Sequence, residues 1–72
     1  MATRGEDKGT VALGDALFEL RRIGPSVRVA AIDPRTNTEV VVVGAAAAGD
    51  AALMRLALRK LNTVLAGRGG GG

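Results

Sequence analysis

The side chains that most often act as nucleophiles, proton carriers or metal ligands are scarce in this sequence. It has no cysteine and no histidine, so neither a disulfide nor a thiolate or imidazole metal site can form. Tyrosine is absent, and the single serine, Ser26, has no histidine to activate it. The carboxylates of the central region are scattered along the chain, at Asp15, Glu19, Asp33, Glu39 and Asp50. We therefore predict a protein that is not an enzyme and that binds no cofactor or metal.

One segment has the glycine spacing of a phosphate-binding loop. Residues 44–51 read GAAAAGDA, and their two glycines are separated as in the P-loop pattern GxxxxGK[ST]. A P-loop needs a lysine that reaches the phosphates and a hydroxyl that holds magnesium, but Asp50 and Ala51 occupy those positions. We predict instead an alanine-rich linker that leads into a helix capped by Asp50.

Basic side chains offer the other route to a binding function. Ten Lys and Arg against seven Asp and Glu give a net charge of +3, a weak pointer to an anionic partner. The candidate anion-binding residues are Arg21, Arg22, Arg28, Arg55, Arg59 and Lys60. Weak electrostatic binding of nucleic acid, in the manner of a double-stranded RNA-binding domain, is thus an alternative function. Dispersal of these six side chains over opposite sides of the fold would count against it.

Three extended segments must position these residues. They are LFELRRI (17–23), VRVAAI (27–32) and TEVVVV (38–43), separated by the turn signals GPS and DPRTN, which predicts a three-stranded antiparallel meander with strand order 1-2-3. A four-residue loop at 34–37 places Asp33 opposite Thr38. A two-residue loop at 24–25 likewise places Leu20 opposite Val29.

A helix is predicted from Asp50 to Ala66, with Gly67 ending it. Its apolar stripe contains Met54, Ala57, Leu58, Leu61, Val64 and Leu65. Packed on one face of the meander, this helix gives an α+β fold of βββα order. The predicted centre of its core is Phe18, Leu20, Val29, Val42, Leu58 and Leu61. The domain is expected to span residues 15–66, between a mobile tail at 1–14 and a flexible glycine tail at 67–72.

The run EVVVVG at 39–44 would be apolar on both sides of its strand, although a half-buried strand normally alternates apolar and polar residues. The sheet face away from the helix therefore gains a large apolar patch, made of Leu17, Ile23, Ala30, Ile32, Val41 and Val43. A soluble monomer rarely leaves such a patch open, and the valine strand carries no lysine or proline to protect its edge. We predict a homodimer, formed by pairing this edge or by packing this face.

The alternative is a monomer in which the segment VALGDAL, residues 11–17, folds back over the same face. No apolar run approaches the ~20 residues of a membrane-spanning helix, and the N-terminal residues lack the apolar core of a signal peptide. We expect a cytoplasmic protein without a membrane partner. A further, unidentified protein partner remains open.

The sequence also resembles a family of small, uncharacterised bacterial proteins of unknown function. The resemblance is carried by an FE-x-RR-x-G opening, an AIDP-x-T-x-TEV turn and an ALRKL helix, within residues 17–65. It covers the whole expected domain and implies no activity.

Overall fold

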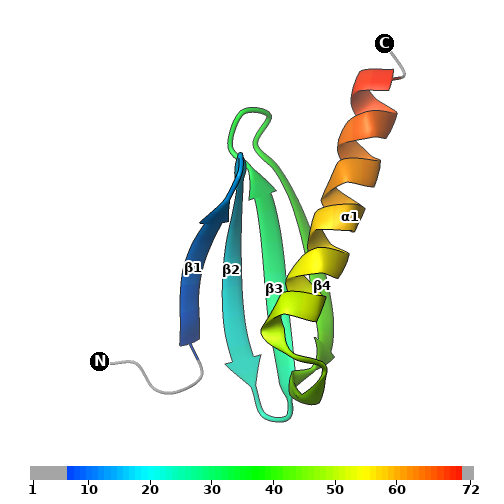
Figure 1. Ribbon diagram of the computed structural model, residues 1–72. Helices are drawn as coiled ribbons and strands as arrows, with labels where there is room; N and C mark the ends of the chain where they lie inside the picture. Colours follow the sequence, from blue (N-terminus) through cyan, green and yellow to red (C-terminus); the bar gives the residue numbers. More distant parts are fainter. Residues whose placement is uncertain (1–6, 71–72) are drawn as a thin grey trace.

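The computed structural model describes the backbone of residues 7–70, which form one antiparallel sheet and one long helix (Figure 1). The strands are β1 (Asp7–Leu13), β2 (Ala16–Ile23), β3 (Ser26–Asp33) and β4 (Thr38–Ala45). They lie in the sheet in the order β1-β2-β3-β4. A short 3-10 turn, η1 (Ala46–Ala48), leads into α1 (Asp50–Gly70).

The predicted α+β class with a C-terminal helix is confirmed, but the predicted number of three strands is wrong. Residues 7–13, assigned to the tail, form β1 and pair with β2 up to Leu13 opposite Ala16. Gly14, with φ 59°, closes this hairpin in the left-handed conformation that glycine adopts without strain. The segment VALGDAL therefore extends the sheet and does not fold over its face. The part of the predicted tail at 1–6 lies outside the described residues.

The other two turns form as predicted, and they fix which side chains share a face. Leu20 lies opposite Val29, and Asp33 lies opposite Thr38. The Asp33 carboxylate accepts hydrogen bonds from the Arg35 backbone N–H at 3.3 Å and from the Thr36 hydroxyl at 2.8 Å. Such a carboxylate stabilises the loop by satisfying donors that have no strand partner.

The core lies between the sheet and α1, which packs over β3 and β4 (Figure 1). Of the six residues predicted at its centre, Val42 and Leu58 are only partly buried, and the other four are buried. On the helix, the buried row is Leu53, Ala57 and Leu61. The helix is thus rotated toward Leu53, which the predicted stripe omitted, and Val64 is left 36% exposed.

α1 begins at Asp50 as predicted, but its N-cap residue and its C-terminal end differ from the prediction. The Leu53 N–H donates to the Gly49 carbonyl at 3.2 Å, so Gly49 caps the helix and Asp50 is its first residue. The carboxylate of Asp50 still lies in the first turn, where the helix dipole favours negative charge. At the other end, Gly67 does not take the left-handed conformation that would end the helix. The helix therefore continues to Gly70.

One helix is too narrow to cover all of this sheet face. A helix is ~10 Å across and neighbouring strands are ~4.8 Å apart, so a helix covers about two strands. On β1, Val11 is 38% and Leu13 is 50% exposed. An apolar groove, here called the β1 groove, remains between β1 and the half-buried Met54 and Leu58 of α1.

The rotation of α1 can be tested with leucine truncations. Leu61→Ala removes a side chain that is 1% exposed, and we expect it to lower the free energy of unfolding by about 2 to 5 kcal/mol. Leu56→Ala makes the same change at a side chain that is 50% exposed and should change stability by less than about 0.5 kcal/mol. Urea unfolding followed by circular dichroism measures both. Equal losses from the two variants would contradict the assigned packing face.

Candidate self-association surface

The sheet face turned away from α1 is not covered by any element of residues 7–70 (Figure 1). We call it the open face. The strand register places its β2, β3 and β4 side chains in four crosswise rows. From one end of the sheet to the other, these rows are Ile23, Ser26 and Ala45; Arg21, Arg28 and Val43; Glu19, Ala30 and Val41; and Leu17, Ile32 and Glu39.

All six residues of the predicted self-association surface lie on the open face. Val43 is 62% and Ile23 is 51% exposed. Three more, Leu17, Ile32 and Val41, are partly buried by their neighbours in the sheet. Ala30 has no exposed surface although no element covers it, because larger side chains surround this short one. The open face thus has a low centre and exposed apolar residues toward its ends.

The open face also carries charges of both signs in adjacent rows. Arg21 lies directly opposite Arg28 across the β2–β3 ladder, and Glu19 lies in the next row beside Ala30. Glu19, Arg21 and Arg28 also line a shallow depression that extends to Gly9 and Thr10 of β1. Apart from Glu39 at the β4 end of the last row, the charged residues of these rows therefore lie on β2 and β3.

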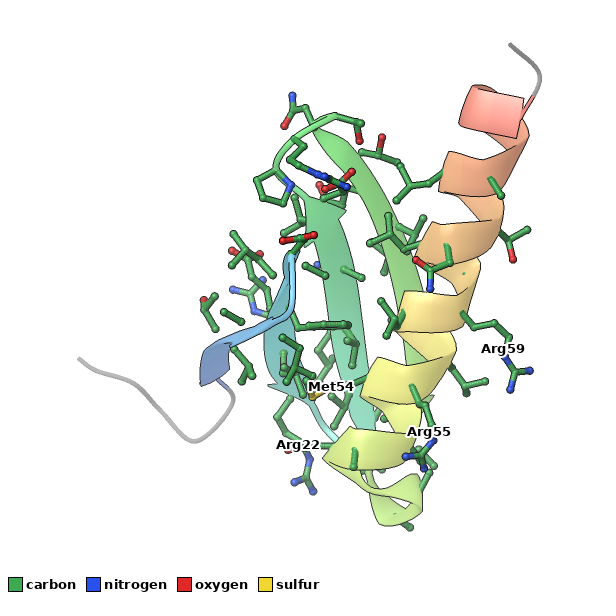
Figure 2. The ribbon with its side chains drawn as sticks, turned by 45° about the horizontal axis from the view of Figure 1, so that its top comes forward. Arg22, Met54, Arg55 and Arg59 are labelled. Atoms are coloured by element: carbon green, nitrogen blue, oxygen red, sulfur yellow. The ribbon has the colours of Figure 1, made fainter. Side chains whose placement is uncertain are left out.

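The structure does not bring the six candidate anion-binding residues together. Arg21 and Arg28 lie on the open face, whereas Arg55 and Arg59 project from α1 into solvent (Figure 2). Arg22, on the helix side of β2, donates from its Nε to the Gly24 carbonyl at 2.6 Å. No continuous basic strip connects these positions within the described residues.

Lys60, the sixth residue of this set, reaches from α1 to the outer edge of the sheet. Its ammonium donates to the backbone carbonyl of Val41 in β4 at 3.2 Å. The valine strand itself has no lysine, as the sequence indicated, but the helix supplies one across 19 positions of sequence. A charged side chain held at the edge of a sheet opposes the addition of another strand. Edge pairing at β4 is therefore less favourable than the sequence alone suggested.

The GAAAAGDA segment has a packing role. Gly44 belongs to β4 and faces α1, and a Cβ added there would overlap the Cδ2 of Leu53. The alanines that follow end β4 and form η1, and Gly49, with φ 92°, connects η1 to the helix. The strand before this segment pairs antiparallel with β3, whereas a P-loop follows a strand of a parallel sheet. The first glycine therefore serves close strand–helix contact.

Among residues 9–67, whose side chains the structure describes, no group of three or more His, Cys, Asp or Glu is placed to hold a metal ion. Residues 7–70 also contain no membrane-spanning helix, because their one α-helix is not apolar enough over a sufficient length to cross a membrane.

Residues 13–68 match the model of a family described as a domain of unknown function (DUF6898). The chain belongs to the DUF6898 family. This membership confirms the resemblance to a family of unknown function. The matched DUF6898 region contains β2, β3, β4 and η1 and most of α1, whereas β1 lies outside it except for Leu13. No curated protein and no solved structure matches the chain.

The packing role of Gly44 can be tested by adding a methyl group. Gly44→Ala forces Leu53 or the backbone to move, and we expect a loss of about 1 to 3 kcal/mol in unfolding free energy. Gly67→Ala is the matched control, because a Cβ there meets no atom within 4 Å, and alanine should stabilise the helix by up to ~1 kcal/mol. Thermal unfolding of both variants measures the difference. A Gly44→Ala protein as stable as wild type would refute the close contact.

The edge-protecting role of Lys60 predicts an effect on aggregation. Lys60→Ala frees the Val41 carbonyl, and we expect faster growth of light scattering at a fixed protein concentration on warming. Arg59→Ala removes the same charge one residue earlier, from an exposed side chain. If both variants aggregate at the same rate, the loss of net charge is the cause and the edge contact contributes nothing.

Proposed function

We propose that this DUF6898 protein is a small, non-enzymatic interaction module that self-associates as a homodimer through the open face. The observation that carries the proposal is that six apolar residues lie on one uncovered sheet face. An antiparallel sheet can leave one face in water, but the residues on such a face are usually polar. Here β4 presents Val41 and Val43 to that side. Packing against a second copy would remove both from water.

Face packing is favoured over pairing at the β4 edge. The Lys60 ammonium donates a hydrogen bond to the Val41 carbonyl, and α1 packs over β3 and β4 (Figure 1). A strand added at this edge would have to displace the lysine and pass beside the helix. The open face needs no such rearrangement, and a two-fold arrangement would close the assembly at two copies.

The size of the open face predicts a weak dimer. The spacing between strands and the rise per residue give the size of the patch: its three strands and four rows span about 10 Å by 20 Å between the outermost Cα atoms. Stable complexes usually bury about 800 Å² on each partner, and this patch lies near or below that size. We expect a dissociation constant on the order of micromolar. Small domains commonly gain needed stability by oligomerisation, so even weak association would matter to this one.

No specific observation favours the nucleic-acid alternative. The six basic side chains are divided between the open face, α1 and the helix side of β2, and duplex binding requires several phosphates to be neutralised by one surface. The proposal includes no cofactor or metal, since cysteine and histidine are absent from the sequence and its carboxylates are scattered. It also places the protein in the cytoplasm, where a domain without cysteine needs no oxidising environment.

Sedimentation equilibrium can test the proposal with two valine variants. Val43 is 62% exposed on the open face, and Val11 is 38% exposed on the helix side of β1. We expect wild type to reach the dimer mass at high micromolar concentration. Val43→Lys should weaken association at least tenfold, because it places a charge in the contact. Val11→Lys should leave association unchanged.

Two results would contradict the proposal in different ways. A wild-type mass that stays monomeric at high micromolar concentration would refute self-association. A dimer lost in Val11→Lys but kept in Val43→Lys would move the interface to the β1 groove. Circular dichroism of each variant checks that its fold is retained.

A further inference from the structure

We infer that the two copies pack open face on open face about a two-fold axis that runs across the strands, placing Glu19 of each copy against the Arg21–Arg28 pair of the other. The axis passes between the row that contains Arg21 and the row that contains Glu19. This inference rests on the proposed self-association and adds the geometry of the contact.

The register determines which residues such an axis brings together. Adjacent rows are two residues apart along each strand, which is about 6.8 Å. An axis across the strands places each strand over its own copy in the opposite direction and exchanges the two central rows. Glu19 then faces Arg21, Ala30 faces Arg28, and Val41 faces Val43.

Charge complementarity supports this arrangement. Arg21 and Arg28 are directly opposed in the β2–β3 ladder, so their guanidinium groups belong to the same part of the open face. The partner subunit's Glu19 would lie over Arg21 and one strand away from Arg28, within reach of both guanidinium groups. Arginine–carboxylate pairs form strong, directional hydrogen bonds. The two-fold axis makes this contact twice.

Shape complementarity also supports this axis. Arg28 is partly buried and would extend over the second copy's Ala30, whose short side chain lies at the low centre of the open face. The apolar stem of an arginine packs well on such a surface while its charged end reaches a partner. Toward the ends of the sheet, Ile23 faces Leu17 and Ser26 faces Ile32. Packed sheets cross at about 30°, which brings the central rows closest and separates the corners.

Other two-fold axes place charges less favourably. An axis through one of the central rows sets Glu19 against Glu19 or Arg28 against Arg28. An axis along β3 also opposes the two copies of Arg28, and one between β2 and β3 opposes Arg21 to Arg28. An axis between β3 and β4 buries Glu39 against Ile32. Like charges that face each other across a contact oppose association, and a charge buried there without a partner pays a desolvation cost.

Charge reversal tests the pairing directly. Glu19→Arg and Arg21→Glu each place like charges across the axis, and we expect each to weaken the dimer at least tenfold in sedimentation equilibrium at low salt. The double variant Glu19→Arg/Arg21→Glu restores opposite signs and should return to within about threefold of wild type. Glu39→Arg is the matched control on the same face, because its corner position should change association less than threefold.

Cross-linking gives a second measurement that does not need the charge variants. The chain has no native cysteine, so Ile23→Cys and Leu17→Cys each introduce one thiol. Across the inferred axis Ile23 lies about 10 Å from the partner subunit's Leu17, whereas two copies of Ile23 are more than about 20 Å apart. A short bismaleimide should therefore join the two variants in a mixture but join neither variant to itself.

The outcomes separate the geometry from the function. A monomeric wild type would overturn the proposed function and this inference with it. A dimeric wild type in which the double charge variant is no stronger than the single ones would overturn the axis alone. Cross-linking of Ile23→Cys to itself as readily as to Leu17→Cys would also overturn the axis while leaving self-association intact.

Discussion

The close approach of α1 to β4 at Gly44 and Leu53 is the contact on which the rest of the structure depends. Because residue 44 has no side chain, Leu53 can lie directly against the strand. This contact holds the start of the helix over β4, so that the buried row continues through Ala57 to Leu61. The same placement allows Lys60 to reach the edge carbonyl of Val41. One glycine thus connects the helix position, the core and the protected edge.

The position of the helix also determines which apolar surfaces remain open. Because α1 covers β3 and β4, the β1 groove stays accessible on the helix side, and the entire opposite face has no cover from residues 7–70. The two surfaces differ chemically. The β1 groove is almost wholly apolar beside Leu13 and Met54, whereas the open face combines apolar residues with Glu19, Arg21 and Arg28 in adjacent rows. Ordered charges of both signs can specify one orientation of a partner, which a purely apolar groove does less well.

Local signals in the sequence were sufficient to predict the turns but not β1 or the rotation of α1. The turns were predictable because Asp33, Asn37 and Gly24 have backbone or side-chain preferences that act over a few residues. β1 was missed although Gly14-Asp15 is a hairpin signal, because its polar start resembles a tail. The helix rotation was ambiguous because apolar residues occur around much of α1. The burial of Leu53 is favoured only by Gly44, which lies outside the helix. No pattern predicts that Lys60 reaches Val41. These are contacts between residues far apart in sequence.

The apolar surface that a single copy leaves in water is the same surface that would favour a second copy. Val43 is 62% exposed on the open face, and apolar surface in contact with water lowers the stability of the fold. This cost falls when a second copy covers the face. A ligand that binds only the folded state stabilises it in proportion to the logarithm of its concentration, and in a homodimer the ligand is the protein itself. Under the proposed geometry, the stability of this small fold would therefore rise with its own concentration, so that folding and self-association would be a single coupled equilibrium.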